Sequence, residues 1–283
     1  MAELIVDTIT AKLEYFVPPA DGSKPYSYVA QPPAGVPRSN HTSREHVVQI
    51  ENVRGKEDSF SLDRHGFYFG KHPAGHTSFK NDEEIKKEYY AESIELIKRL
   101  TGASKVVLFD HTVRRREAGE TPTLEVNSDK RGPAPRVHVD QTPEAARKRV
   151  HQNLPAKEAE ERLEHRFQII NLWRPISHAA LDWPLALCDF RSVNWEKDLV
   201  PTDLKFPERD GQTFSVKYNP EHKWKYVRGL TPEEIILIKC YDSIEDGSVA
   251  VLTPHTAFED PTTPAGTPPR ESIELRALVF YDN

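Results

Sequence analysis

The sequence predicts a mainly β protein, a distorted double-stranded β-helix (jelly roll) with a few helices packed outside it. Most strand-like runs follow residue 167, whereas the clearest helices precede it, and this order of few helices and many strands is typical of the fold. The segments around His138 and His255 both read as strands. A length of 283 residues fits one all-β domain. We therefore expect a single domain over residues 1–283, with an extended N-terminal arm of about 60 residues.

The N-terminal arm is expected to be extended because its periodicity and prolines exclude long helices. Residues 8–17 alternate apolar and polar side chains, which predicts a strand, and residues 47–53 are a second candidate. Between these segments, residues 18–40 contain six prolines, so no helix is expected there.

Three helices are predicted in the first 170 residues. Residues 81–100 are the clearest, because acidic side chains fill the first turn, apolar residues recur at helical spacing and Gly102 follows. Thr142 in front of Pro143 predicts the start of a second helix. A third, highly charged helix is expected over residues 156–166.

The remaining elements are predicted strands. A buried strand is expected over residues 105–110. Residues 231–241 are ambiguous, because Thr231-Pro232 resembles a helix start, but the β-branched residues that follow favour a strand. The C-terminal candidates are residues 167–173, 213–218, 234–241, 248–252 and 272–280.

His138-Val139-Asp140 is the most informative motif. Residues two apart on a strand point to the same face, so His138 and Asp140 can bind one ion together. His255, at the end of the strand-like run 248–255, is the expected third ligand. Two imidazoles and one carboxylate are typical of a non-haem Fe(II) centre that keeps positions open for a co-substrate and O2.

The last strand predicts an anion-binding face. An Fe(II) enzyme that uses 2-oxoglutarate needs a cation for the distal carboxylate, and the planar fork of arginine suits it best. Arg270 and Ser272 lie two apart and face the same way, and Glu274 and Arg276 share their parity. This polar face indicates an internal cavity; the alternative is an edge strand whose polar face lies in water.

Aromatic segments supply candidate walls for a substrate pocket. Tyr218 and Trp224 flank a turn, and Trp173 and Arg174 end a strand. The alternatives are that the aromatic residues cover the core and that Arg174 pairs with a surface acid. The glycine- and aromatic-rich segment 66–76 is expected to be a flexible loop near the pocket.

Composition excludes several classes of protein. A net charge of −6 argues against a nucleic-acid partner, and no run approaches the roughly 18 apolar residues of a membrane span. The N-terminus lacks the pattern of a signal peptide. Cys188 and Cys240 are too few for a disulfide framework, so a cytoplasmic protein with reduced thiols is expected, as a monomer or homodimer.

Six motifs carry a family resemblance: Arg136–Thr142, Asn171–Pro175, Tyr218–Trp224, Leu230–Ser243, Pro254–Pro261 and Pro269–Arg276. Taken in order, they resemble the fungal and bacterial hydroxylase/desaturase family typified by the gibberellin desaturase and the cephalosporin 7-alpha-methoxylase small subunit. The resemblance extends from about residue 11 to the C-terminus. It implies a 2-oxoglutarate/Fe(II) oxygenase of secondary metabolism that hydroxylates or desaturates an unactivated carbon of a small-molecule natural product.

The resemblance also implies roles for single residues. It assigns iron ligation to His138, Asp140 and His255. It assigns the co-substrate to Arg270, with Ser272 or Arg276, and the choice between the two arginines stays open. Two other readings also stay open. One is a metal-dependent hydrolase or isomerase that uses the same ligands without 2-oxoglutarate, and the other is a non-catalytic partner subunit.

Overall fold

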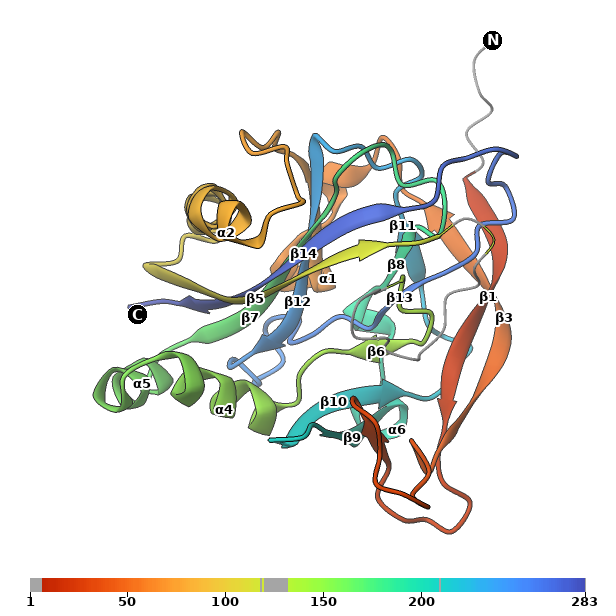
Figure 1. Ribbon diagram of the computed structural model, residues 1–283, viewed down its shortest axis with the longest axis horizontal. Helices are drawn as coiled ribbons and strands as arrows, with labels where there is room; N and C mark the ends of the chain where they lie inside the picture. The colour runs from red at the N-terminus through yellow and green to blue at the C-terminus, as the bar shows by residue number, and fades with distance from the viewer. Residues whose placement is uncertain (1–6, 118, 120–131, 209, 283) are drawn as a thin grey trace.

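Two curled β-sheets form the framework of the protein, with helices at the periphery (Figure 1). The computed structural model describes residues 7–117, 119, 132–208 and 210–282. The nine-stranded sheet has the order β1 (Thr8–Val17), β3 (Thr42–Asn52), β11 (Trp224–Tyr226), β8 (Leu185–Cys188), β13 (His255–Ala257), β6 (His138–Val139), β10 (Asp210–Val216), β9 (Leu199–Lys205), β2 (Tyr26–Tyr28). The five-stranded sheet has the order β4 (Phe67–Lys71), β12 (Glu234–Asp242), β7 (Phe167–Pro175), β14 (Glu271–Phe280), β5 (Lys105–Arg115). The predicted jelly-roll class is confirmed.

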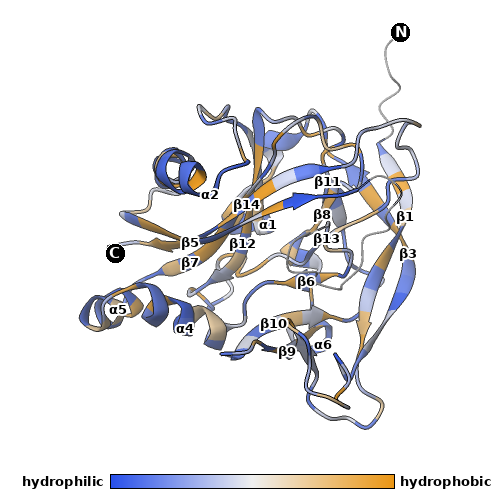
Figure 2. Cartoon of the chain, viewed as in Figure 1, coloured by the Kyte–Doolittle hydropathy of each residue, from blue (hydrophilic) through white to orange (hydrophobic). Residues whose placement is uncertain are grey.

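Helices cover the outside of the sheets and begin and end as their sequence signals predict. The Asn81 side chain caps the first long helix by accepting from the Glu83 amide, and Gly102 ends it in the left-handed region. The Thr142 hydroxyl accepts from the Ala145 amide. Figure 2 shows that α4 and α5 carry mostly hydrophilic residues. The helical elements are α1 (Leu62–His65), α2 (Asp82–Glu84), a π-helical turn (Ile85–Tyr89), α3 (Tyr90–Thr101), α4 (Pro143–Asn153), α5 (Ala156–Leu163), α6 (Trp195–Asp198) and two 3-10 turns (Glu57–Ser59, Phe190–Ser192).

The N-terminal segment contributes both edge strands of the nine-stranded sheet. β1 pairs antiparallel with β3 over its whole length, and its alternate residues Ile9, Leu13 and Tyr15 are buried. At the far edge β2, from the proline-rich segment, pairs parallel with β9. β1 and β2, both from the first 60 residues, therefore form the two edges of this sheet.

β14 is a central strand, paired with β7 on one side and β5 on the other. Its polar face and Arg270 just before it are buried: Arg270 is 2% exposed, Ser272 1% and Glu274 7%. The alternative of an edge strand with its polar face in water is therefore wrong. The opposite face packs Ile273 and Leu275 into the core that α3 covers.

Two segments differ from their predictions. Residues 248–252 form no strand, because the Ala250 amide bonds to the Asp63 carbonyl and the Thr253 hydroxyl to the Gly66 carbonyl, so the next strand begins only at His255. Within 66–76, predicted as a flexible loop, residues 67–71 form β4 against β12, since Phe67 and Phe69 alternate into the core.

The ambiguous segment 234–241 is a strand, β12, as its β-branched residues favoured. No helix in the described ranges has the length and apolar character needed to span a bilayer.

Candidate active site

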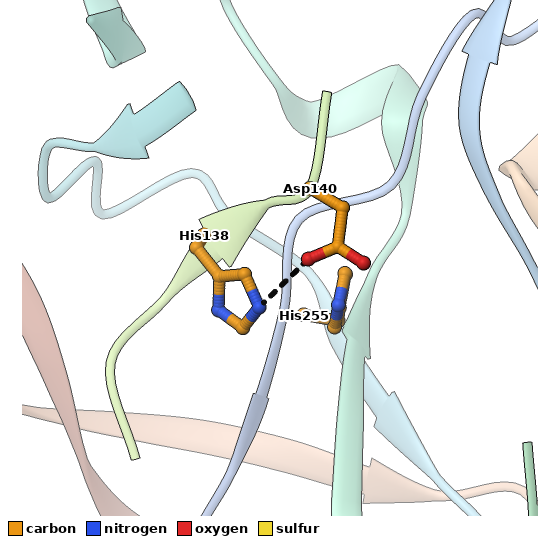
Figure 3. Close-up of side chains that lie close together, drawn as sticks. All are labelled: His138, Asp140 and His255. Carbon is orange, nitrogen blue, oxygen red and sulfur yellow. Dashed lines mark ion pairs between the residues drawn. The ribbon is translucent and has the colours of Figure 1, made fainter. Parts of the chain in front are cut away.

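His138, Asp140 and His255 converge between the two sheets. Their ligand atoms all lie within 4.8 Å of one another, and the three side chains point toward a common centre (Figure 3). His138 and His255 are directly opposite in the β6–β13 register, and Asp140 follows β6 immediately. The His138 Nε2 lies 3.4 Å from the Asp140 Oδ1. The predicted spacing thus produces a compact set of three donors.

Backbone carbonyls orient both imidazoles. The Nδ1 of His138 lies 2.7 Å from the Arg136 carbonyl, and the Nδ1 of His255 lies 3.0 Å from the Thr253 carbonyl. Because a carbonyl only accepts, we assign the proton of each ring to Nδ1. The Nε2 lone pairs then face the shared centre, which is the arrangement that metal-binding histidines use.

The five-stranded sheet fixes the carboxylate of Asp140. Asn171 on β7 donates its Nδ2 to the Asp140 Oδ2 at 2.7 Å, and the Arg276 Nε on β14 lies 3.4 Å from the same oxygen. Asn171 and Arg276 are directly opposite in the β7–β14 register. The Oδ2 of Asp140 thus accepts from the five-stranded sheet, and its Oδ1 faces His138.

Charge at the cluster favours an ionised carboxylate. Burial raises the pKa of Asp140, but the hydrogen bond to His138 and the positive charge of Arg276 outweigh it and hold the pKa well below its usual range. Burial lowers the pKa of His138, but the bond and charge of Asp140 reverse this, so the pKa is raised. Burial and the nearby His138 lower the pKa of His255. A bound cation would therefore displace a proton from His138.

A cavity of about 610 Å³ opens at the cluster, and His138, Asp140 and Arg276 form part of its wall. Such a volume suits a small organic molecule. Most of the rest of the wall comes from the β2 segment, α4 and the β9–β10 hairpin, and β5 and residues 132–136 complete it. It includes Ser27, Val29, Ala145, Lys148, Leu204, Phe206, Gln212 and Thr213.

Arg270 and Ser272 carry buried polar atoms that lack partners. The Arg270 guanidinium lies over the Trp173 ring, 5.6 Å from its centroid, and donates from Nη1 to the Trp183 carbonyl. Its Nε and the Ser272 Oγ are buried without a hydrogen-bond partner. Burial and the charge of Arg114 lower the pKa of Arg270 to about 9. A carboxylate placed here would satisfy both atoms and compensate the charge.

Arg276, the alternative anion anchor, is already compensated. It donates to the Thr112 hydroxyl at 3.0 Å and forms ion pairs with Asp110, Asp140 and Glu274. These acids raise the pKa of Arg276 despite its burial. Its place in the site is beside the carboxylate of Asp140.

The four expected pocket residues lie elsewhere in the described structure, and none belongs to the cavity lining. Trp224 is 1% exposed and donates to the Tyr15 hydroxyl, because β11 buries it inside the nine-stranded sheet. Tyr218 stacks on the His46 ring at the surface. The Trp173 ring packs against the Arg270 guanidinium.

Arg174 donates to the Tyr89 hydroxyl and to the carbonyls of His72 and Pro232. The guanidinium is thus used internally to join β7 to neighbouring segments. The alternative prediction, that Arg174 pairs with a surface acid, is wrong because its donors bond to the Tyr89 hydroxyl and to backbone carbonyls.

Asn171 was not singled out from the sequence. It is a polar side chain in the middle of β7, flanked by the apolar Ile170 and Leu172, and all residues of this strand are buried. A buried amide needs hydrogen-bond partners, so such a residue inside an apolar run signals a site. Arg136, which precedes His138 by two positions, belongs to the motif Arg136–Thr142, and no other feature of the sequence marks it.

A jelly roll with two histidines and one carboxylate at a cavity defines the class of non-haem iron oxygenases. Residues 13–280 match the model of a family described as an oxidoreductase/YMDC permease-like domain. The chain belongs to this family, and proteins similar to it are fungal hydroxylase/desaturases and Fe(II)/2-oxoglutarate-dependent dioxygenases. The family resemblance drawn from the motifs is confirmed.

Individual relatives cover nearly the whole chain. The hydroxylase/desaturase efuI of Hormonema carpetanum is 35% identical, over 98% of this chain and 96% of its own. The Fe(II)/2-oxoglutarate-dependent dioxygenase nvfI of Aspergillus novofumigatus is 33% identical over 94% of both. A solved structure of the iron and alpha-ketoglutarate-dependent endoperoxidase NvfI superposes with a TM-score of 0.83 and 31% identity, covering 98% of this chain and 99% of that one.

Proposed function

We propose that the protein is an Fe(II)/2-oxoglutarate-dependent dioxygenase that hydroxylates or desaturates a small-molecule natural product of secondary metabolism. The cluster of His138, Asp140 and His255 at the cavity carries this proposal, with these three residues as the iron ligands. Membership in the family supports the same reaction class. Iron, 2-oxoglutarate and O2 would supply the oxidising chemistry at a C–H bond of the substrate.

Arg270 and Ser272 would hold the distal carboxylate of 2-oxoglutarate. The unpartnered Arg270 Nε and Ser272 Oγ support this choice over Arg276, whose donors already meet acids. The protein's own part is to orient: carbonyls fix the imidazoles, Asn171 fixes Asp140, and the cavity wall confines the substrate.

The chain would act as a single domain over residues 1–283, in the cytoplasm, as a monomer or homodimer and without a nucleic-acid partner. Free, buried Cys188 and Cys240 are compatible with a reducing compartment.

The test is anaerobic titration of the protein with Fe(II) and 2-oxoglutarate, followed by the visible charge-transfer band of a chelated keto acid. We expect a band that disappears in His255→Ala and that needs far more 2-oxoglutarate in Arg270→Ala than in Arg276→Ala. Lys157→Ala, at a side chain 91% exposed, is the matched control.

Other outcomes would replace the proposal. Fe(II) binding without the band would favour a metal-dependent hydrolase or isomerase. A protein that binds no metal would be a non-catalytic subunit.

A further inference from the structure

Arg136 lies on the cavity wall two residues before His138. The chain alternates here: Arg136, His138 and Asp140 belong to the lining, whereas Val137 and Val139 are fully buried in the core. Side chains two apart on an extended chain are separated by about 7 Å. A group bound at Arg136 is thus held beside the three candidate ligands.

The other charges around the cavity are largely paired. Asp203 lies 2.7 Å from Lys24, and Glu144 lies 2.7 Å from Lys148. In contrast, the Arg136 guanidinium makes no ion pair within the described part of the chain, and its buried Nε has no hydrogen-bond partner. Glu14, which is bridged to Arg136 through the backbone, accepts instead from the Ser43 hydroxyl.

The charge of Arg136 also affects His41, which lies next to the lining residue Ser27. His41 is 5% exposed, and its Nε2 lies 2.9 Å from the hydroxyl of the lining residue Ser27. Burial and the positive charge of Arg136 lower the pKa of His41 to about 4. Arg136 thus places a positive charge at this part of the wall, and an incoming anion would gain from it.

We propose that Arg136 binds a carboxylate of the substrate, which makes the substrate class an acid with an apolar skeleton. Arginine presents two parallel N–H donors to a carboxylate, and the neighbouring wall supplies apolar contacts from Val29, Leu204 and Phe206. The inference rests on the proposed function, because the carboxylate orients the skeleton toward the proposed iron ligands.

The test compares two probes of equal shape, 2-naphthoate and the neutral 2-naphthamide, by ligand-observed NMR at saturating 2-oxoglutarate. We expect Arg136→Gln to weaken 2-naphthoate binding about tenfold, the usual loss for a charged hydrogen bond. The affinity for 2-naphthamide should stay within about twofold. Arg136→Lys should retain part of the naphthoate affinity because it keeps the charge.

Lys148→Gln is the matched control, since it removes a cavity charge that already has a partner. Unchanged naphthoate binding in Arg136→Gln, equal loss in Lys148→Gln, or no naphthoate binding to the wild type would each overturn the proposal. The anaerobic Fe(II)/2-oxoglutarate band is recorded for every variant. A wild type without the band would reject the proposed function, and the two probes, compared without 2-oxoglutarate, would still test Arg136 as an anion site.

Discussion

At the scale of single residues, the two oxygens of Asp140 are in different environments. Oδ2 accepts from Asn171, while Oδ1 faces His138. A carboxylate held in this way offers one oxygen to a metal, and its rotation is blocked. Groups that orient metal ligands commonly contribute one to two orders of magnitude to metal affinity.

Asn171→Ala should therefore weaken Co(II) or Fe(II) binding about 10- to 100-fold, because Asp140 loses its neutral donor. The affinity can be measured by competition with a chelator of known strength. Asn153→Ala, which removes an amide bonded to the Arg149 carbonyl of its own helix, should leave the affinity unchanged. Equal affinities of Asn171→Ala and wild type would show that Arg276 alone positions the carboxylate.

At the scale of elements, a buried charge network joins α1, β7 and β12. Lys239 is 0% exposed and lies 2.7 Å from Asp242 and 2.8 Å from Asp63. Arg166, just before β7, pairs with the same two acids. These contacts link the short helix α1 to the five-stranded sheet.

Asp242→Ala should lower the free energy of unfolding by about 3–5 kcal/mol, because it leaves a buried ammonium with a single, half-exposed partner. Urea denaturation with an unchanged slope would measure the loss. Glu144→Ala, which breaks an exposed pair, should cost less than about 1 kcal/mol. Similar losses in both variants would mean that the network adds nothing to stability.

Long elements can be predicted from this sequence, whereas its shortest strands cannot. Long elements with their own signals were predictable: β1 by its alternation, and the helix after Asn81 by its cap and Gly102. β6, β11 and β13 have only two or three residues, and they exist because longer neighbours supply hydrogen bonds. No periodicity can be read from such lengths.

Prediction of the site follows a similar division. The His-x-Asp spacing and the parity of Arg270 and Ser272 are local, so the sequence contains them. The contact of Asn171 with Asp140 depends on how the two sheets pack, and the cavity wall depends on segments far apart in the chain. Trp224 was expected in a pocket wall but lies in the core, because residue type alone does not distinguish an aromatic core residue from an aromatic pocket residue.

At the scale of the whole molecule, histidines make folding sensitive to mild acid. The pKa of His41 is about 4 in the folded protein and about 6.5 when exposed. Between these values the unfolded chain binds the extra proton, so stability is complete above about pH 6.5 and falls as the pH drops toward 4. Allowing for solvent screening, His41 alone would account for roughly 1–2 kcal/mol.

His41→Gln should flatten the dependence of the unfolding free energy on pH between about 7 and 4. The measurement is a series of urea titrations across this range. His151→Gln, at a side chain 44% exposed, should keep the wild-type slope. A slope in His41→Gln as steep as in the wild type would assign the acid sensitivity to other groups.

Because the cluster draws on the nine-stranded sheet and is held by the five-stranded sheet, metal binding should stabilise the whole fold. Co(II) at about 100 times its dissociation constant should add about 2.7 kcal/mol to the unfolding free energy. Thermal unfolding with and without Co(II) measures this. The gain should vanish in His138→Ala, and a gain that persists there would place the metal elsewhere.

Most of the cavity wall outside the metal cluster comes from the β2 segment, α4 and the β9–β10 hairpin, and none of these segments carries a residue of the cluster. Substitutions in these segments can therefore change which substrates the cavity accepts while the metal ligands stay the same. This separation offers a physical route by which one lineage diversifies. It accords with relatives that carry the names hydroxylase, desaturase and endoperoxidase on a common scaffold.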